Sequence, residues 1–414
     1  MQRIARRARD GWGAHLSSGR RLSWLGLLIV LAVALVACAT STGGAAKPAP
    51  GQPPAAAQPS AASQPAAAGQ PPAAQQGGTA SAWDQLVATA RQEGEVVLVG
   101  PPNQDLREAL NNTFAKEFGI RVSYLPDQGT EYVAKLKAER PAGRFTVDAV
   151  VGGAPSWYYE RDTLLTSLRS KLILPEVTDP NNWLDGKLWW VDQEEDKLLR
   201  FAIYVNANLV VNPDQVDPRQ LTSWDVLMDP KFKGKMTSQT ATRSGHGGGT
   251  AAYLYYMLGS EKFKALYVDQ AVVYFDDTRQ AAEAVARGTH PIGLGIDGAF
   301  IEPLTSRGLK MEVVRPSDAP GYLSAGFTTL MLVDRPPHPN AAQLFANWAA
   351  ARAGNEVITR AVHNVSTRRD VVSAWAPEYN KPKDGVQYLD SNSWQYLTEI
   401  RTAAEKGVQE AVGR

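Results

Sequence analysis

Hydrophobic positions along residues 81–414 recur with two periods, one helical and one extended, which follow each other in turn. Four apolar side chains between Trp83 and Ala90 fall on one helical face, and Gly94 stands where a left-handed residue commonly ends a helix. The apolar run EVVLVG at 95–100 follows directly. This region is therefore predicted to begin with a helix that leads into a strand.

The same alternation continues along the chain. A helix is predicted over 106–118, where Leu and Phe repeat every four residues before Gly119, and another over 130–140. Strands are predicted at 120–125 and 147–153. Strands that alternate with helices at this spacing indicate an α/β fold with a mostly parallel sheet and helices on both faces.

A second α/β unit is predicted from about 213 to 310, and a last strand and helical pair follow it. The region from 81 to 414 is longer than one hydrophobic core usually supports, so two lobes are expected. The predicted segments are helices at 221–228, 250–258, 277–288 and 339–361 and strands at 233–239, 271–275, 291–297, 311–316 and 323–333.

The first 37 residues have the pattern of an export signal. Arginines precede the uncharged apolar run Trp24–Ala37, which suits a signal peptide and is short for a membrane span. Cys38 is the only cysteine, and the LVAC that it ends resembles the lipobox of bacterial lipoproteins, in which this cysteine is lipidated. An ordinary signal peptide and an uncleaved anchor helix are the alternatives. The Sec and twin-arginine export routes both stay open.

Residues 38–80 are predicted to be the lipidated cysteine and a disordered linker. From 39 to 80 the chain contains only Ala, Pro, Gln, Gly, Ser and Thr apart from Lys47. Such side chains bury too little surface to offset the entropy lost on ordering. We expect the linker to hold a globular body away from a lipid anchor in the bacterial cell membrane.

Composition narrows the chemistry of the exported part. Removal of 1–37 takes away six of 43 basic and one of 42 acidic residues and leaves a mildly acidic chain, which argues against nucleic acid as a partner. With Cys38 assigned to lipid, no thiol is left for disulfides, zinc or catalysis. No G-x-S-x-G motif occurs, and no histidine has an acid at helpful spacing. No catalytic residue and no cofactor are therefore expected, and an anchored hydrolase is a distant alternative.

Several motifs in order along the chain resemble those of periplasmic-type solute-binding proteins of ABC importers, in the ferric-iron and small-solute group of the type II fold. They lie at 83–100, 147–153, 201–211 (with Tyr204 and Asn206), 223–236 and 338–358. The resemblance covers essentially all of 81–414. It implies a two-lobed fold in which 81–205 and 318–414 form lobe 1 and 206–317 form lobe 2.

The same resemblance implies a function. Such a protein is an extracytoplasmic, membrane-anchored monomer that binds one small-molecule or metal-ion solute between its lobes and delivers it to ABC permease subunits. Closure would occur about hinge segments near 202–206 and 314–326. A sensory binding protein that signals to a membrane receptor is an alternative. Ferric iron, a phosphonate, a polyamine, thiamine and a carboxylate all stay open as solutes.

The glycine-rich segment 242–250 is the main candidate for solute contact. A glycine loop that opens a helix can hold an anion by backbone N–H groups, here those of Ser244, Gly245 and Gly247, with charge added by Arg243. No lysine follows the glycines, which disfavours a nucleotide-binding P-loop. A loop whose glycines merely permit a tight turn is the alternative.

His246 and Asp297 are the next candidates for ligand binding. His246 has no partner at metal-ligand spacing and is expected to form hydrogen bonds rather than bind a metal. Ferric-binding relatives commonly carry adjacent tyrosines after the strand that here spans 291–297, whereas this chain has Asp297-Gly298-Ala299. No metal ligand is therefore predicted. Asp297 would either receive a cationic part of a solute or cap the following helix.

Two loops of the first lobe complete the predicted site. The segments 101–104 and 152–158 follow strands, and α/β sheets bind ligands at the carboxyl ends of their strands. They supply Asn103, Ser156 and Tyr158 as candidate ligand-binding residues. Helix capping by Ser156 and core packing of Tyr158 are the alternatives.

Overall fold

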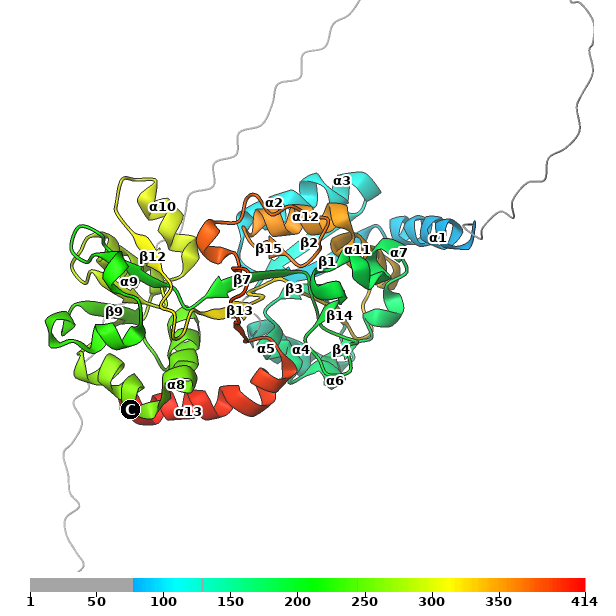
Figure 1. Ribbon diagram of the computed structural model, residues 1–414. Helices are drawn as coiled ribbons and strands as arrows, with labels where there is room; N and C mark the ends of the chain where they lie inside the picture. Colours follow the sequence, from blue (N-terminus) through cyan, green and yellow to red (C-terminus); the bar gives the residue numbers. More distant parts are fainter. Residues whose placement is uncertain (1–76, 128–129, 244, 414) are drawn as a thin grey trace, which may run out of the picture. The chain divides into compact units, whose positions relative to one another are not determined.

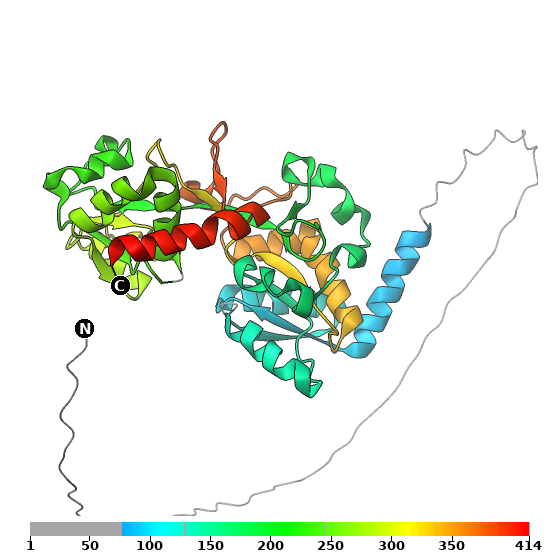
Figure 2. The ribbon, with the colours of Figure 1, turned by 90° about the horizontal axis from the view of Figure 1, so that it is seen from below.

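The computed structural model describes residues 77–127, 130–243 and 245–413, which form a two-lobed α/β body (Figures 1 and 2). The predicted export signal, Cys38 and the linker up to residue 76 lie outside the described residues, as does Ser244. Within the described part, no helix combines the length and apolar character needed to cross a membrane.

A seven-stranded sheet forms the centre of the first lobe. Strands β1, β2 and β3 run parallel, whereas β14 is antiparallel to β3 and also pairs with β4 and β6. The sheet is therefore mixed, and the predicted parallel arrangement holds for its first three strands. In spatial order the strands are β2 (Arg121–Pro126), β1 (Glu95–Gly100), β3 (Ala149–Gly152), β14 (Thr329–Val333), β6 (Leu199–Arg200) and β5 (Trp189–Trp190), with β4 (Leu165–Thr166) beside β14.

Helices cover both faces of this sheet. Val150 and Val151 of β3 enter different hydrophobic clusters because successive side chains of a strand point to opposite faces. The predicted helix over 106–118 is broken at Thr113, whose hydroxyl donates to the Ala109 carbonyl oxygen at 2.6 Å and competes with continuation of the helix. The helices are α1 (Gly77–Glu93), α2 (Gln104–Asn112), α3 (Phe114–Phe118), α4 (Thr130–Glu139), α5 (Ala154–Tyr158), α6 (Arg161–Leu164), α7 (Pro175–Thr178), α11 (Pro339–Ala350) and α12 (Arg352–Ala361).

The second lobe contains a five-stranded sheet. Strands β9, β10 and β11 are parallel, and β8 runs antiparallel to both β11 and β12. The predicted helix at 221–228 is instead a 3-10 helix, Trp224–Met228. The order is β10 (Val273–Phe275), β9 (Met236–Gln239), β11 (Ile292–Leu294), β8 (Leu209–Val211) and β12 (Glu312–Val314), and the helices are α8 (His246–Lys264), α9 (Thr278–Ala286) and α10 (Ile301–Thr305).

A four-stranded sheet connects the lobes. The chain leaves the first lobe through β7 and enters the second through β8, and it returns from β12 through β13. The two connecting strands pair with each other, with Tyr322 opposite Asn206. The sheet order is β15 (Val365–Ser366), β7 (Ala202–Asn206), β13 (Tyr322–Ser324) and β16 (Leu389–Asp390).

Arg315 fastens the crossing of these two connections. Its Nη1 donates to the carbonyl oxygens of Asn206 and Ala207, each at 3.2 Å. Its Nη2 donates to the Val205 and Tyr379 carbonyl oxygens at 3.1 and 2.9 Å and to Asn208 Oδ1 at 2.6 Å. Burial lowers the pKa of Arg315 to about 10, so the guanidinium is charged at neutral pH. One cation thus binds carbonyl groups at the end of β7, in the link between β7 and β8, and at Tyr379.

The C-terminal helix α13 (Arg401–Val412) packs against α8, and Val408 belongs to the hydrophobic cluster of the second lobe (Figure 1). The sequence assigns 318–414 to lobe 1 as a whole. The contacts of α13 favour moving this helix to lobe 2, and the division of the chain between the lobes is otherwise a proposal.

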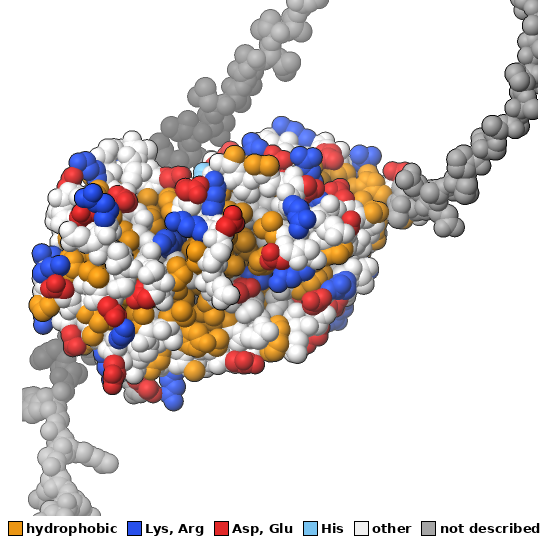
Figure 3. Space-filling view, in the orientation of Figure 1, with side chains coloured by type: hydrophobic (Ala, Val, Ile, Leu, Met, Phe, Trp, Pro, Cys, Tyr) orange, Lys and Arg blue, Asp and Glu red, His pale blue; other side chains and the backbone are white. Residues whose placement is uncertain are grey.

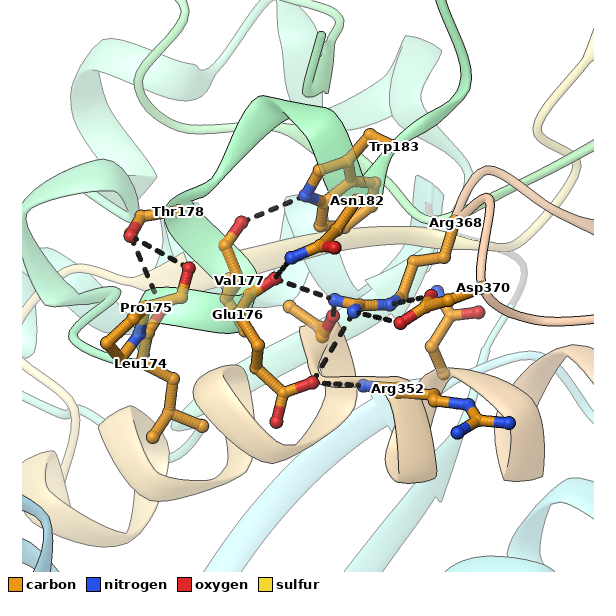
Figure 4. A network of polar contacts seen from close by, with 12 residues as sticks. Leu174, Pro175, Glu176, Val177, Thr178, Asn182, Trp183, Arg352, Arg368 and Asp370 are labelled. Carbon is orange, nitrogen blue, oxygen red and sulfur yellow. Dashed lines mark hydrogen bonds and ion pairs between the residues drawn. The ribbon is translucent and has the colours of Figure 1, made fainter. Parts of the chain in front are cut away.

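A buried arginine attaches the segment after β15 to the first lobe (Figure 4). The Arg368 side chain is fully buried and donates to both carboxylate oxygens of Asp370, at 2.9 and 2.8 Å. It also donates to the carbonyl oxygens of Glu176 and Ala350 at 3.2 and 3.0 Å. Desolvation acts against the Asp370 carboxylate, but its bonds to Arg368 prevail and lower its pKa. The network therefore joins three segments that are distant in sequence.

We expect Arg368→Ala to lower the free energy of unfolding by about 2–3 kcal/mol, because it leaves buried carbonyl groups and a half-buried carboxylate without their donor. Arg369→Ala is the matched control, since Arg369 is exposed. Urea unfolding followed by tryptophan fluorescence measures both changes. Equal unfolding free energies for the two variants would contradict the structural role of Arg368.

Candidate functional site

A cavity of about 720 Å³ lies between the lobes. Pro155 lines it from the first lobe, while the connecting strands β7 and β13 supply Tyr204, Asn206, Tyr322 and Ser324. The second lobe and α13 line the remaining sides. From these and from the turn before α13 the cavity receives Gln239, Thr242, Arg243, Gly245, His246, Gly248, Gly249, Asp276, Asp277, Thr278, Asp297, Tyr396, Arg401, Glu405 and Gln409, among others.

The glycine-rich loop reaches this cavity from the carboxyl end of β9, as the sequence predicts. Gly245 has φ of 132° and ψ of −166°, a conformation that only glycine adopts readily. A Cβ at Gly248 would collide with the Arg243 carbonyl oxygen, so the loop can fold this tightly only without side chains there. The Gly247 N–H donates to Gln239 Oε1 at 3.1 Å and is therefore occupied by the protein rather than free for an anion.

The charged side chains of the cavity are arranged in pairs. Arg243 Nη1 lies 3.0 Å from Asp276 Oδ1, and the Arg243 side chain is 55% exposed. Hydrogen bonds from Thr240 and Arg243 lower the pKa of Asp276. On α13, Arg401 Nε lies 2.8 Å from Glu405 Oε1. The cavity thus presents neighbouring donors and acceptors instead of a uniform positive field.

His246 and Asp297 form a further pair. His246 Nδ1 lies 3.3 Å from Asp297 Oδ2, and both side chains are about one-fifth exposed. Asp297 Oδ1 also accepts from the Ala299 N–H at 3.0 Å and so caps the short helix Gly298–Phe300. The capping role that the sequence allows for Asp297 is confirmed, and its second oxygen remains oriented toward the cavity residue His246.

Three tyrosines from separate segments also line the cavity. Burial raises the pKa of Tyr204 to about 12, and a hydrogen bond with Ser324 offsets part of this effect. Burial likewise raises the pKa of Tyr396 to about 12 and that of Tyr322 well above its ordinary value. All three phenols are therefore neutral hydrogen-bond donors near pH 7. Sequence reasoning missed them because the chain segments that carry them meet only in the folded protein.

The predicted residues of the first lobe lie elsewhere. Asn103 caps α2, where its Oδ1 accepts from the Leu106 N–H at 2.8 Å. Tyr158 is 3% exposed and packs in the core against Trp157, with the Arg161 guanidinium over its ring. Neither these two nor Ser156 lines the cavity, which touches the same loop at Pro155. The core-packing alternative for Tyr158 is therefore confirmed.

Over the residues that the structure describes, no three His, Cys, Asp or Glu side chains gather closely enough to hold a metal ion.

On the face seen in Figure 3, acidic and basic side chains are interspersed over both lobes.

A two-lobed α/β body with a polar cavity between its lobes and paired connecting strands behind it has the architecture of a solute-binding protein. The chain belongs to the family of bacterial extracellular solute-binding proteins, whose model matches residues 109–384, more than half of the chain. The class and fold predicted from the sequence are confirmed. Members of this family act outside the cytoplasm.

Individual relatives are distant in sequence. Iron uptake protein A1 of Synechocystis sp. is 21% identical over 154 residues, 37% of this chain and 40% of that protein. The chain thus spans less than half the length of this curated relative. Trichodesmium IdiA (FutA), solved with iron and citrate, shares 17% identity and a TM-score of 0.58 over 77% of this chain and 99% of its own. AfuA from Actinobacillus pleuropneumoniae, solved with fructose-6-phosphate, shares 17% identity and a TM-score of 0.56 over 77% and 98%.

The raised tyrosine pKa values predict how solute binding depends on pH. Because the folded pKa of Tyr204 and Tyr396 is about 12, their donors persist below that pH and are lost only above it. Between about pH 8 and 10 we therefore expect the tyrosines to cause no change in affinity and no release of protons on binding. Calorimetry in two buffers of different ionisation enthalpy measures both. Release of protons from tyrosines on binding would indicate tyrosinate ligation and contradict this expectation.

Proposed function

We propose that this protein is the membrane-anchored receptor of an ABC import system, which captures one small polar solute and presents its closed form to the permease. The observation that carries this proposal is the cavity, whose lining comes from the first lobe, the second lobe and both connecting strands. A solute bound there touches both lobes at once. It would therefore stabilise the closed arrangement, since only that arrangement makes both sets of contacts.

The hinge would lie at the paired strands β7 and β13, which both pass between the lobes. These strands form a short paired sheet, and Gly321, with φ of 120°, stands just before β13 in a conformation that favours glycine. Dihedral changes at the ends of the two connections would rotate one lobe relative to the other. The predicted hinge segments 202–206 and 314–326 therefore stay part of the proposal.

Hydrogen-bonding groups on an organic or complexed solute suit this cavity better than a bare ferric ion. The position after β11 carries Asp297, which already pairs with His246 and caps a helix. The tyrosines that do line the cavity come from three separate segments and not from adjacent positions after β11. The fold itself accommodates both an iron-and-citrate complex, as in Trichodesmium IdiA (FutA), and a sugar phosphate, as in AfuA. We therefore favour a solute that offers acceptors to phenol and amide donors.

The receptor would act as a monomer attached to the membrane by lipid on Cys38, with 39–76 as the spacer, since α1 begins at Gly77 and not after residue 80 as the sequence predicts. The arguments are the position of the only cysteine after an apolar run and the absence of large side chains from 39 to 80. A flexible coil of this length reaches on the order of 35–40 Å, enough to let a body of this size meet a permease in the same membrane.

Binding of one solute is expected to raise the thermal stability of the protein. At a hundredfold excess over its Kd, a solute stabilises the native state by about 2.7 kcal/mol, which corresponds to a rise in Tm of several degrees. The panel is ferric citrate, fructose 6-phosphate, methylphosphonate, spermidine, thiamine and succinate. An unchanged Tm with every member of the panel, together with turnover of a test ester or phosphate ester, would favour the alternative that the protein is a membrane-anchored hydrolase.

The anchor has its own test. In cells that express the full chain, Cys38→Ala should move the protein from the membrane fraction to a soluble fraction and abolish incorporation of a radioactive fatty acid. Ser41→Ala is the control, and it should leave both the fractionation and the labelling unchanged. Continued labelling of the Cys38→Ala variant would contradict lipidation at this residue.

A further inference from the structure

The C-terminal segment formed by residues 396–412 contacts both lobes. Tyr396 and Leu397, in the π-helical turn Tyr396–Ile400 that leads into α13, belong to a hydrophobic cluster of the first lobe. Val408 of α13 belongs to the core of the second lobe. Figure 2 shows the helix (red) extending from the centre of the body along the second lobe. This segment lies beyond residue 384, where the match to the family model ends.

Specific polar contacts attach the first end of this segment. The buried guanidinium of Arg200 donates to both carboxylate oxygens of Asp390, at 2.7 and 2.6 Å. Asn392 Oδ1 accepts from the Ala325 N–H at 2.7 Å. The Tyr159 hydroxyl donates to the Leu397 carbonyl oxygen at 2.6 Å. These contacts fix residues 390–397 on the first lobe.

Close packing attaches the other end. A Cβ at Gly407 would overlap the ring of Tyr255 on α8, so the two helices approach each other here as only glycine allows. Val408 is 1% exposed, and Ala411 and Val412 pack against the same core. The helix is therefore held on the second lobe by apolar contacts along its last turns.

Between these attachments the helix turns one face toward the cavity. Arg401, Glu405 and Gln409 recur every four residues, which places them on one side of a helix, and all three line the cavity. Lys406 and Glu410 form a similar i,i+4 pair at 3.8 Å, are largely exposed and do not line it. The same helix thus carries one charged pair at the cavity and one on its outer surface.

We propose that α13 is a third wall of the solute cleft, besides the two lobes, and that Arg401, Glu405 and Gln409 contact the bound solute and determine specificity. The proposal rests on the proposed solute-binding function. Arg401 offers guanidinium donors, Glu405 offers acceptors 2.8 Å away, and Gln409 offers both. Such a wall recognises a solute that carries an acceptor, such as an anionic oxygen, beside a hydroxyl or ammonium donor.

The third wall also connects solute binding to lobe movement. Because the segment is attached to one lobe by residues 390–397 and to the other by 407–412, the lobes can rotate only if the turn between them deforms. The π-helical turn 396–400 lies at this place, and such turns within helices are rare and frequent at functional sites. A solute held by the face of α13 would therefore order this turn as the cleft closes.

A matched pair of double variants of the full chain tests the proposal. R401A/E405A removes the pair at the cavity, and K406A/E410A removes the outer pair of the same helix, so that both variants lose one i,i+4 pair and gain two alanines. The probe is the member of the solute panel that raises the Tm of the unmodified chain most, titrated by calorimetry. We expect at least a tenfold loss of affinity for R401A/E405A and less than a twofold change for K406A/E410A. Similar Tm values of the two unliganded variants show that both fold.

The possible results distinguish the proposed contacts of α13 with the solute from the proposed solute-binding function. If the unmodified chain and both double variants bind the probe with equal affinity, the third wall is wrong and the solute-binding function stands. If both double variants lose affinity equally, the helix supports the cleft only structurally, and the assignment of contacts is overturned. If the unmodified chain binds no panel solute, the function proposed for these solute classes fails, and the third wall fails with it. In the supporting case, bound solute also slows amide hydrogen exchange at 396–409.

Discussion

The passage of two paired strands between the lobes, beside the half-buried guanidinium of Arg315, is the constraint on which the rest of this structure depends. The chain passes between the lobes at β7–β8 and returns at β12–β13, and Arg315 binds carbonyl groups at the end of β7 and in the link to β8. Its positive charge has no carboxylate among the partners that it donates to, and it is stabilised by carbonyl and amide dipoles. Loss of these bonds would leave several buried carbonyl groups without donors at the point where the lobes meet.

The cavity follows from this crossing. Tyr204 and Asn206 come from one connection and Tyr322 and Ser324 from the other, so the back of the cavity consists of the two connecting strands, where the hinge is proposed. The glycine loop and the pair His246–Asp297 face it from the second lobe. A solute in this position touches the strands about which the lobes would rotate, which couples its binding to their relative orientation.

Periodicity along the chain predicted most helices and strands, because each is set by the spacing of apolar residues within a few turns. It also placed the glycine loop at the cavity, since the carboxyl end of β9 must lie at the edge of its sheet. It failed where contacts between distant segments determine the role of a residue. Asn103 and Tyr158 follow strands as expected, yet Asn103 caps a helix and Tyr158 packs in the core. Tyr204, Tyr322 and Tyr396 meet only after folding; the motif at 201–211 includes Tyr204 without assigning it to the site, and no local pattern marks the other two.

The central claim is that solute binding brings the two lobes together, and a distance measurement between the lobes tests it most directly. Spin labels at Glu117 of the first lobe and Arg307 of the second, both exposed, can be introduced as cysteines in a chain whose Cys38 is replaced. Double electron–electron resonance then reports the distance distribution with and without the stabilising solute. The account predicts a distribution that becomes narrower and shifts on binding. A distribution that stays unchanged at saturating solute would contradict it.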